Sequence, residues 1–179
     1  MSAVADDPVD DLVAAVRRAV AAVTDPEYPD LTIEDLGILE YVECTGATTD
    51  CGGEGMKVRV GLVPTVLGCP ALRAIEADVV AAARSAAMLD VPADARPIDV
   101  AVDVVFLTSP AWSTERIRPR ARAYLARELT IALRRRDGEV TCPVCGSAAV
   151  RHRSDFGPTR CREVWWCEAC RNPVEVLRS

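Results

Sequence analysis

Four cysteines near the end of the chain have the spacing of a metal site. They form two Cys-x-x-Cys pairs, Cys142 with Cys145 and Cys167 with Cys170, and 21 residues separate the pairs. Each pair lets two sulfur atoms converge on one ion, so the two pairs together predict a tetrahedral site of four thiolates. Zinc is the first choice of metal, iron bound as in rubredoxin would use the same ligands, and redox chemistry is the other use of such pairs.

The segment that carries these pairs, residues 138–179, is too short to build a sufficient hydrophobic core. We therefore expect metal binding to supply most of its folding free energy, as in a zinc ribbon. Cys161 and His152, the single histidine of the chain, lie between the pairs and are candidate extra ligands. The alternative for both is an ordinary surface or packing position of the ribbon. Trp165 and Trp166 alternate on a predicted strand, and we expect one of them to pack against the cysteine pairs.

A further cysteine, Cys69, stands where a strand is expected to lead into a helix. Pro70 suits the first position of that helix. This would make Cys69 the N-cap, where unpaired backbone N–H groups stabilise a thiolate. Gly68 lets the backbone approach closely, and Thr65 would supply a hydroxyl at the same place. The alternative is a small buried hydrophobe, the usual state of a lone cysteine.

Hydrophobic periodicity predicts the elements that position these side chains. Apolar residues at helical spacing predict helices from Pro8 to before Pro26, from about Pro70 to about Met88, and from Pro119 through Ala132. Alternating apolar residues predict strands over 38–42, 58–62 and 100–106, and the prolines of 25–30 predict a rigid loop. The order of these elements predicts an α+β domain in which helices pack on a three-stranded sheet, followed by the four-cysteine ribbon.

The composition is that of a folded globular protein. The chain has 179 residues, of which 50% are hydrophobic and 27% charged. No apolar stretch approaches the ~20 residues of a membrane span, and the acidic first twelve residues do not resemble the start of a signal peptide. The sequence therefore predicts a soluble cytoplasmic protein. In that reducing compartment its eight cysteines indicate metal or thiol chemistry and not disulfides.

The charge is distributed unevenly along the chain. The net charge of −6 combines −13 over residues 1–115 with +7 over residues 116–179. This polarity indicates two modules or a charged partner. With a helix end and linker expected at 134–139, we predict domains at 1–137 and 138–179. The acidic first module argues against nucleic-acid binding by the whole protein. Four arginines nevertheless keep that function open for the ribbon: Arg151, Arg153, Arg160 and Arg162.

Four short motifs occur in order along the first part of the chain. They are Asp25-Pro26-Glu27, Leu36-Gly37-Ile38, Pro64-Thr65 with Gly68-Cys69-Pro70, and Ser109-Pro110-Ala111-Trp112-Ser113-Thr114. Together they resemble the small-domain family of iron–sulfur carriers and targeting factors, over about residues 10–133. A further stretch in the ribbon is Phe156-Gly157-Pro158-Thr159-Arg160-Cys161. With it, the whole chain resembles the D-subunit family (PaaD, also called PaaJ) of phenylacetyl-CoA epoxidase systems.

This resemblance implies an accessory, non-catalytic role: maturation of metal centres for the multicomponent oxygenase of aerobic phenylacetate degradation. It implies that Cys69 holds or transfers iron–sulfur units as a transient cluster, with Asp25, Glu27 and Thr65 nearby. The implied partners are the other epoxidase subunits or the reductase, and a homodimer is a further candidate. The residues agree with a non-catalytic role, because a chain with one histidine cannot supply the two Glu-x-x-His motifs of a di-iron site.

Two other classes of function remain open from the sequence. One is a structural adaptor subunit of the oxygenase complex that transfers no cluster, and the other is a nucleic-acid-binding ribbon protein. Cys44 and Cys51 flank a hairpin that is longer than the family resemblance explains. They are candidate extra cluster ligands, with loop cysteines that have no such role as the alternative.

Overall fold

The computed structural model of this protein describes residues 8–48, 54–89 and 99–178. The chain forms two compact units. The first comprises Met1–Glu34, Leu39–Leu62 and Ala71–Phe106, and the second comprises Asp35–Ile38, Val63–Pro70 and Leu107–Ser179. Within the described part of the chain, no helix is both long and apolar enough to cross a membrane.

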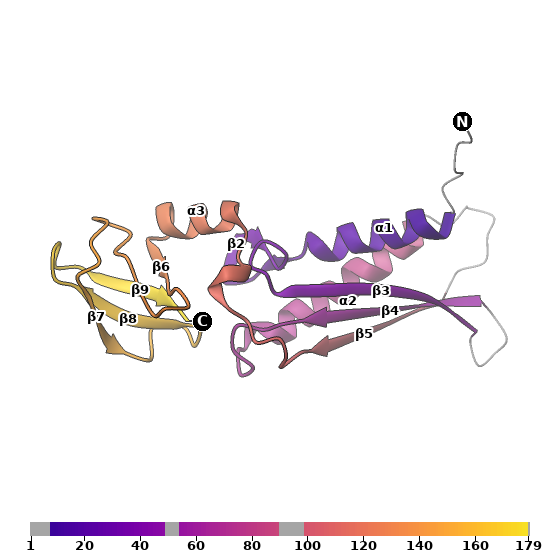
Figure 1. Ribbon diagram of the computed structural model, residues 1–179. Helices are drawn as coiled ribbons and strands as arrows, with labels where there is room; N and C mark the ends of the chain where they lie inside the picture. Colours follow the sequence, from indigo (N-terminus) through magenta and orange to yellow (C-terminus); the bar gives the residue numbers. More distant parts are fainter. Residues whose placement is uncertain (1–7, 49–53, 90–98, 179) are drawn as a thin grey trace, which may run out of the picture. The chain divides into compact units, whose positions relative to one another are not determined.

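A three-stranded sheet forms the centre of the first unit, as the alternating apolar residues predict. Its strands are β3 (Leu39–Thr48), β4 (Glu54–Leu62) and β5 (Asp99–Phe106), in the order β3-β4-β5. β3 and β4 form an antiparallel hairpin, whereas β4 and β5 are parallel. A parallel pair needs a crossover connection, and helix α2 (Ala71–Leu89) lies within it (Figure 1).

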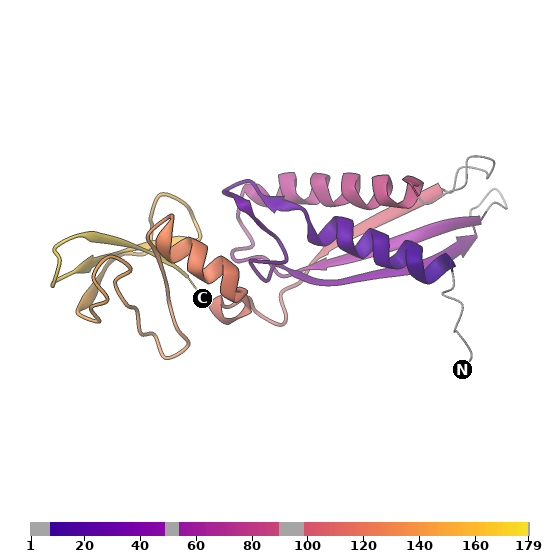
Figure 2. The ribbon, with the colours of Figure 1, turned by 90° about the horizontal axis from the view of Figure 1, so that it is seen from above.

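Helices α1 (Pro8–Ala21) and α2 contact each other, and they also contact β3 and β5 respectively (Figure 2). The core follows from two periodicities. Positions three or four apart on the helices and two apart on β4 turn apolar side chains to the same side. The fully or almost fully buried members of this core are Val16, Val20, Val58, Val60, Leu62, Ile75 and Val79.

The rigid loop predicted over residues 25–30 is instead a small hairpin, and this part of the prediction is wrong. β1 (Thr24–Asp25) pairs with β2 (Tyr28–Thr32), with Asp25 opposite Tyr28. Prolines argue against a strand because they lack an N–H. A two-stranded sheet leaves one edge of each strand unpaired, so it can accommodate Pro29, which is exposed. Burial of Tyr28 and Leu31 supplies the apolar contacts that the loop prediction overlooked.

The second unit contains the ribbon. It includes the short 3-10 helix η1 (Thr114–Arg116) and helix α3 (Pro119–Arg127). A four-stranded sheet follows, in the order β6-β9-β8-β7. Its strands are β6 (Ile131–Leu133), β7 (Val150–Ser154), β8 (Arg162–Cys167) and β9 (Pro173–Leu177). The β6–β9 pair is parallel and the other two pairs are antiparallel.

The third predicted helix is too long. It ends at Arg127, and Thr130 adopts a left-handed backbone conformation with φ of 52°. Ala132 then pairs with Val176 in the sheet and is buried in the ribbon core. The local pattern around Ala132 is compatible with a helix and with a short strand. Pairing with β9, which is distant in the sequence, decides in favour of the strand.

A hydrogen bond joins two of the family motifs in the second unit, Leu36-Gly37-Ile38 and the stretch that contains Trp112. The Trp112 side chain is buried, and its Nε1 donates a hydrogen bond of 3.0 Å to the carbonyl oxygen of Leu36. The Arg116 Nε donates to the carbonyl oxygen of Gly37 at 2.8 Å. Gly37 has φ of +66°, and a Cβ built there would lie 2.5 Å from the Arg116 carbonyl oxygen. These contacts give the Leu36-Gly37-Ile38 motif a structural role.

The ribbon sheet includes residues that precede the predicted boundary at 137/138. Strand β6 lies on the N-terminal side of that boundary and pairs with β9. Next to it, the Arg134 side chain forms an ion pair of 3.2 Å with the buried Glu163 on β8. The Thr114 hydroxyl also donates a hydrogen bond to the Arg134 carbonyl oxygen. Independent folding of 1–137 and 138–179 stays a prediction. A cut at this boundary would separate β6 and Arg134 from their partners in the ribbon.

Candidate metal centre and thiol site

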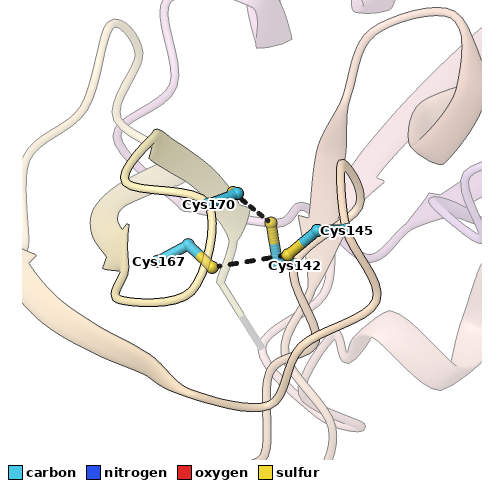
Figure 3. A group of neighbouring side chains, drawn as sticks. All are labelled: Cys142, Cys145, Cys167 and Cys170. Carbon is cyan, nitrogen blue, oxygen red and sulfur yellow. Dashed lines mark hydrogen bonds between the residues drawn. The ribbon is translucent and has the colours of Figure 1, made fainter.

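The four ribbon cysteines point toward one another and form a single cluster (Figure 3). The Cys142 and Cys170 sulfurs lie 3.7 Å apart, the Cys145 and Cys167 sulfurs lie 3.6 Å apart, and all four sulfurs lie within 4.8 Å of one another. Zinc–sulfur bonds of about 2.3 Å in a tetrahedron place the sulfurs about 3.8 Å apart. The donor set and its spacing therefore fit a four-thiolate zinc or iron site.

The two cysteine pairs have the same backbone conformation. The Gly146 N–H donates to the Cys142 carbonyl oxygen, and the Arg171 N–H donates to the Cys167 carbonyl oxygen, both at 2.9 Å. The residue after each pair is left-handed, with φ of 73° at Gly146 and 58° at Arg171. This reversal of the chain presents both sulfurs of a pair to one side. Gly146 is the visible sequence signal for the first turn, whereas an arginine gives no such signal for the second.

The thiols of the cluster do not ionise together. A hydrogen bond from the Asn172 side chain, with the neighbouring thiols acting in the same direction, lowers the pKa of Cys170 to about 6. At Cys145 a backbone hydrogen bond from Ser147 favours the thiolate. Desolvation and hydrogen bonds with the other cysteines outweigh it and raise the pKa of Cys145 to about 12. A bound divalent ion must displace the remaining protons, so metal binding releases protons and weakens as the pH falls.

Two of the four sulfurs belong to the hydrophobic core of the ribbon. Cys142 and Cys167 are buried in one cluster with Val174 and Val176, and Trp165 packs against this cluster as expected for one of the two tryptophans. Cys145 is exposed and Cys170 is half-buried, so one side of the four-sulfur cluster faces solvent. A metal ion held by these four sulfurs would have no position left for water or a substrate, an arrangement typical of structural sites and not of catalytic ones.

Neither candidate extra ligand of the ribbon joins the four-sulfur cluster. Cys161 is buried, and its sulfur lies 3.2 Å from the hydroxyl of Thr159. The His152 Nε2 lies 3.1 Å from a carboxylate oxygen of Asp155, and its ring meets the Trp165 ring edge-on. Neither residue belongs to the four-cysteine group, and a role for either as an extra ligand stays a prediction.

His152 and Asp155 do lie close to Glu163, in a second group whose ligand atoms are within 4.8 Å of one another. The Glu163 carboxylate is buried and forms ion pairs with Arg134 at 3.2 Å and Arg178 at 3.7 Å. A cation placed there would meet two guanidinium groups. We therefore interpret this group as a charge-compensated network and assign no metal to it.

Cys69 lies in an exposed turn of the second unit. Its N–H donates to the carbonyl oxygen of Val66 at 3.1 Å, which leaves Leu67 and Gly68 exposed at the tip, while the Cys69 side chain is half-buried. Helix α2 begins at Ala71. Cys69 is thus one position farther from the helix than the predicted N-cap, because Pro70 occupies the capping position.

The carboxylate of Asp25 has a structural partner. It is buried and accepts a hydrogen bond of 2.7 Å from the Glu27 N–H in the turn between β1 and β2. Asp25 and Glu27 belong to the first unit, whereas Thr65 and Cys69 belong to the second. That these four residues form one site stays a prediction.

Of the two candidate extra ligands near the β3–β4 hairpin, the structure describes Cys44. Cys44 is on β3 opposite Val58 and is half-buried. Burial raises the pKa of the Cys44 thiol, and the charge of Arg17 acts against this rise. Cys44 therefore favours the protonated form, which is a weak metal ligand. Cys51 lies outside the described residues.

Comparison with known proteins connects both parts of the chain to families. Residues 13–93 match the family model "Iron-sulfur cluster assembly protein", and residues 127–178 match "PaaD zinc beta ribbon domain". Over 166 residues the chain is 32% identical to an Escherichia coli (strain K12) protein described as a putative D-subunit of 1,2-phenylacetyl-CoA epoxidase. The match covers 89% of this chain and 88% of that protein. The chain belongs to the PaaD family.

Membership of the PaaD family confirms the resemblance and the predicted α+β domain with a ribbon. The ribbon match begins at residue 127, so it includes β6, in agreement with the observed sheet. Two solved structures are also similar. One is a DUF59 domain from Bacillus anthracis, at 24% identity over 66% of this chain and 94% of that one, with a TM-score of 0.46. The other is a Mycobacterium tuberculosis protein described as associated with Fe–S complex assembly and repair, at 22% identity over 69% and 91% of the two chains, with a TM-score of 0.30.

Proposed function

We propose that this PaaD-family protein is a non-catalytic maturation subunit of a phenylacetyl-CoA 1,2-epoxidase system, which handles iron or iron–sulfur units at Cys69. The observation that carries the proposal is the position of Cys69. It lies within the segment that matches an iron–sulfur assembly family, and its N–H closes an exposed turn. A thiol at such a turn can be reached by a partner protein, which a carrier requires and a core cysteine does not provide.

A single thiolate suits transfer better than storage. Iron–sulfur clusters in proteins are held by about four cysteine thiolates, and Cys69 contributes one. The remaining ligands of a transient cluster would come from the client subunit, the reductase or a second copy of this chain. Because each of these partners can compete for the cargo, one protein ligand holds the unit long enough for delivery without trapping it.

The four-cysteine cluster has a different role in this proposal. Cys142, Cys145, Cys167 and Cys170 would hold one structural zinc, and the ion would supply folding free energy to the ribbon and no chemistry. What supports this is the sulfur spacing together with the closed set of four ligands. Neither the four-sulfur cluster nor the Cys69 turn contains a histidine or carboxylate that would serve as a general base.

The proposal is tested by anaerobic reconstitution with ferrous iron and sulfide of the zinc-loaded protein. Cys69→Ser is the test variant and Cys44→Ser is the matched control. We expect the wild type and Cys44→Ser to gain the visible absorbance and iron of a cluster, and Cys69→Ser to lose both. In cells, Cys69→Ser should also lower maturation of the epoxidase. Equal cluster binding in all three proteins would remove the carrier function and leave a structural adaptor subunit.

A nucleic-acid-binding ribbon is the weaker alternative. Arg151 and Arg153 pair with Glu168 at 3.4 and 3.7 Å, and Arg162 pairs with Glu175 at 2.6 Å. Binding to a phosphate backbone depends on several cations that are free to contact it. Three of the four arginines that kept this function open are already engaged with carboxylates. A salt-dependent shift with DNA or RNA would restore it.

A further inference from the structure

Two loops of the second unit meet beside Cys69. One is the turn formed by Val66–Cys69, and the other is the 155–161 loop between β7 and β8 of the ribbon. A Cβ built on Gly68 would lie 3.4 Å from Nη1 of Arg160, so this guanidinium lies directly against the residue that precedes Cys69. The ribbon thus contributes the Arg160 side chain to the surroundings of Cys69, which belongs to the segment that matches the iron–sulfur assembly family (the assembly-type segment, residues 13–93).

Each of these loops exposes a large apolar side chain. Leu67 is 62% exposed in the first loop and Phe156 is 77% exposed in the second. Exposed apolar side chains are common singly. Here, however, one stands next to Gly68 and the other is in the same short loop as Arg160. Phenylalanine and arginine are also enriched in protein–protein interfaces relative to the rest of the surface.

The loop that carries Phe156 is held in place by hydrogen bonds. The Ser154 hydroxyl donates to the Phe156 carbonyl oxygen at 2.9 Å and accepts from the Phe156 N–H at 3.1 Å. The Gly157 N–H donates to the Arg162 carbonyl oxygen at 2.9 Å, and a Cβ built on Gly157 would meet that oxygen at the same distance. The exposed ring is therefore presented on a preorganised turn, which lowers the entropy cost of docking.

The charge of Arg160 is available to a partner. No carboxylate in the described part of the chain pairs with its guanidinium, unlike those of Arg151, Arg153 and Arg162. An unpaired guanidinium beside exposed apolar side chains is complementary to a carboxylate at the edge of an apolar recess. A carboxylate beside an apolar recess is a feature of protein surfaces, whereas a nucleic acid presents a row of phosphates.

We propose that Leu67, Phe156 and Arg160 form a docking surface through which an acidic partner protein reaches Cys69. The inference rests on the proposed function, since the occupant is the client protein that receives the iron unit from Cys69. The partner presents a carboxylate to Arg160 and an apolar recess to Phe156. This surface gives a function to the Phe156–Cys161 stretch, which neither the metal cluster nor the Cys69 thiol requires.

The test measures binding of the zinc-loaded full-length protein to each purified subunit of the epoxidase system and to the reductase, immobilised in turn. Phe156→Ala and Arg160→Glu are the test variants. Met88→Ala, which removes another exposed apolar side chain, and Arg153→Glu, which makes the same charge change on a paired arginine, are the controls. We expect each test variant to weaken binding by about tenfold or more, which corresponds to about 1.4 kcal/mol, and each control to stay within about twofold.

Zinc content and circular dichroism verify the fold of each variant, and iron–sulfide loading is measured in parallel. Arg160→Glu should load Cys69 like the wild type while failing to dock. If test variants and controls bind alike, or if no subunit binds the wild type, the docking surface is refuted while the carrier function stands. If docking behaves as expected but loading does not depend on Cys69, the carrier function fails and the docking surface stands.

Discussion

Replacing Gly37 by alanine should destabilise the protein without touching the proposed thiol site. Gly37 lies in a family motif, so its substitution separates a structural role of that motif from a functional one. Two features of the structure oppose any side chain here. The φ of +66° is in the left-handed region, and the added Cβ would lie 2.5 Å from the carbonyl oxygen of Arg116.

The expected loss follows from these features. A left-handed conformation costs a residue with a Cβ about 1–2 kcal/mol. Relief of the overlap requires movement of the Arg116 backbone, which costs about 1–3 kcal/mol by analogy with overpacking. That movement also puts at risk the hydrogen bond from Arg116 Nε to the Gly37 carbonyl oxygen, a contribution of about 0.5–1.5 kcal/mol. Together they predict a loss of roughly 2.5–6.5 kcal/mol in the free energy of unfolding, or a fall in Tm of roughly 5–26 °C for a chain of this size.

Gly138→Ala is the matched control. Gly138 also has a positive φ, of +84°, but a Cβ there meets nothing within 4 Å. Its substitution should cost only the conformational part, about 1–2 kcal/mol. Calorimetry of the two zinc-loaded variants measures the difference, and iron–sulfide loading well below the Tm should be normal in both. If Gly37→Ala costs no more than Gly138→Ala, the steric reasoning is wrong. If it stays folded but loses loading, the motif belongs to the functional site.

Three further predictions concern the metal, the domain boundary and the thiols. The purified protein should contain about one zinc or iron per chain, measured by elemental analysis under reducing conditions. Cys167→Ser should lose this metal and Cys161→Ser should keep it. Retention of the metal by Cys167→Ser would refute the ligand set. A fragment of residues 127–179 should bind zinc more tightly than residues 138–179, because only the longer one contains β6, whose Ile131 and Ala132 are buried; equal affinities would show that β6 is dispensable. Burial raises the pKa of Cys44 above the ordinary value of 9.0, so in the native protein its thiol stays protonated past that value and loses its proton only as the pH rises through the raised pKa. Alkylation with peptide mapping should therefore label Cys69 faster than Cys44 between pH 7 and 8, and the reverse order would make Cys69 a structural cysteine.

The sequence predicts most elements of the first unit because their signals are local. Val16 and Val20 lie one turn apart on a helix, and Val58, Val60 and Leu62 alternate on a strand, so each set marks one buried face. Short elements lack such redundancy. Two to five residues of β1, β2 or β6 do not establish a period, and Ala132 is assigned to a strand only through its partner Val176 on β9.

The same distinction applies to the candidate sites. Each Cys-x-x-Cys pair is a local motif, and the convergence of two pairs follows from the geometry of metal binding, so the sequence predicts the four-sulfur cluster. The contact between Arg160 and the Gly68 position joins a ribbon loop to a turn of the assembly-type segment. Local sequence patterns do not predict such a contact between segments that are distant in the sequence. The position of Cys69 relative to α2 is predicted to within one residue, which is the usual uncertainty of a helix start.

The zinc proposed for the ribbon would also fix the position of the proposed docking loop. Strands β7 and β8 carry the loop with Phe156 and Arg160, and β8 ends at Cys167, a buried member of the four-sulfur cluster. A metal that holds Cys167 against Cys142 therefore holds the strands from which the docking loop extends. On this proposal a closed site with no open coordination position contributes to the function proposed for Cys69. The ion would take no part in iron transfer, and its effect would be to keep the proposed docking loop in one conformation.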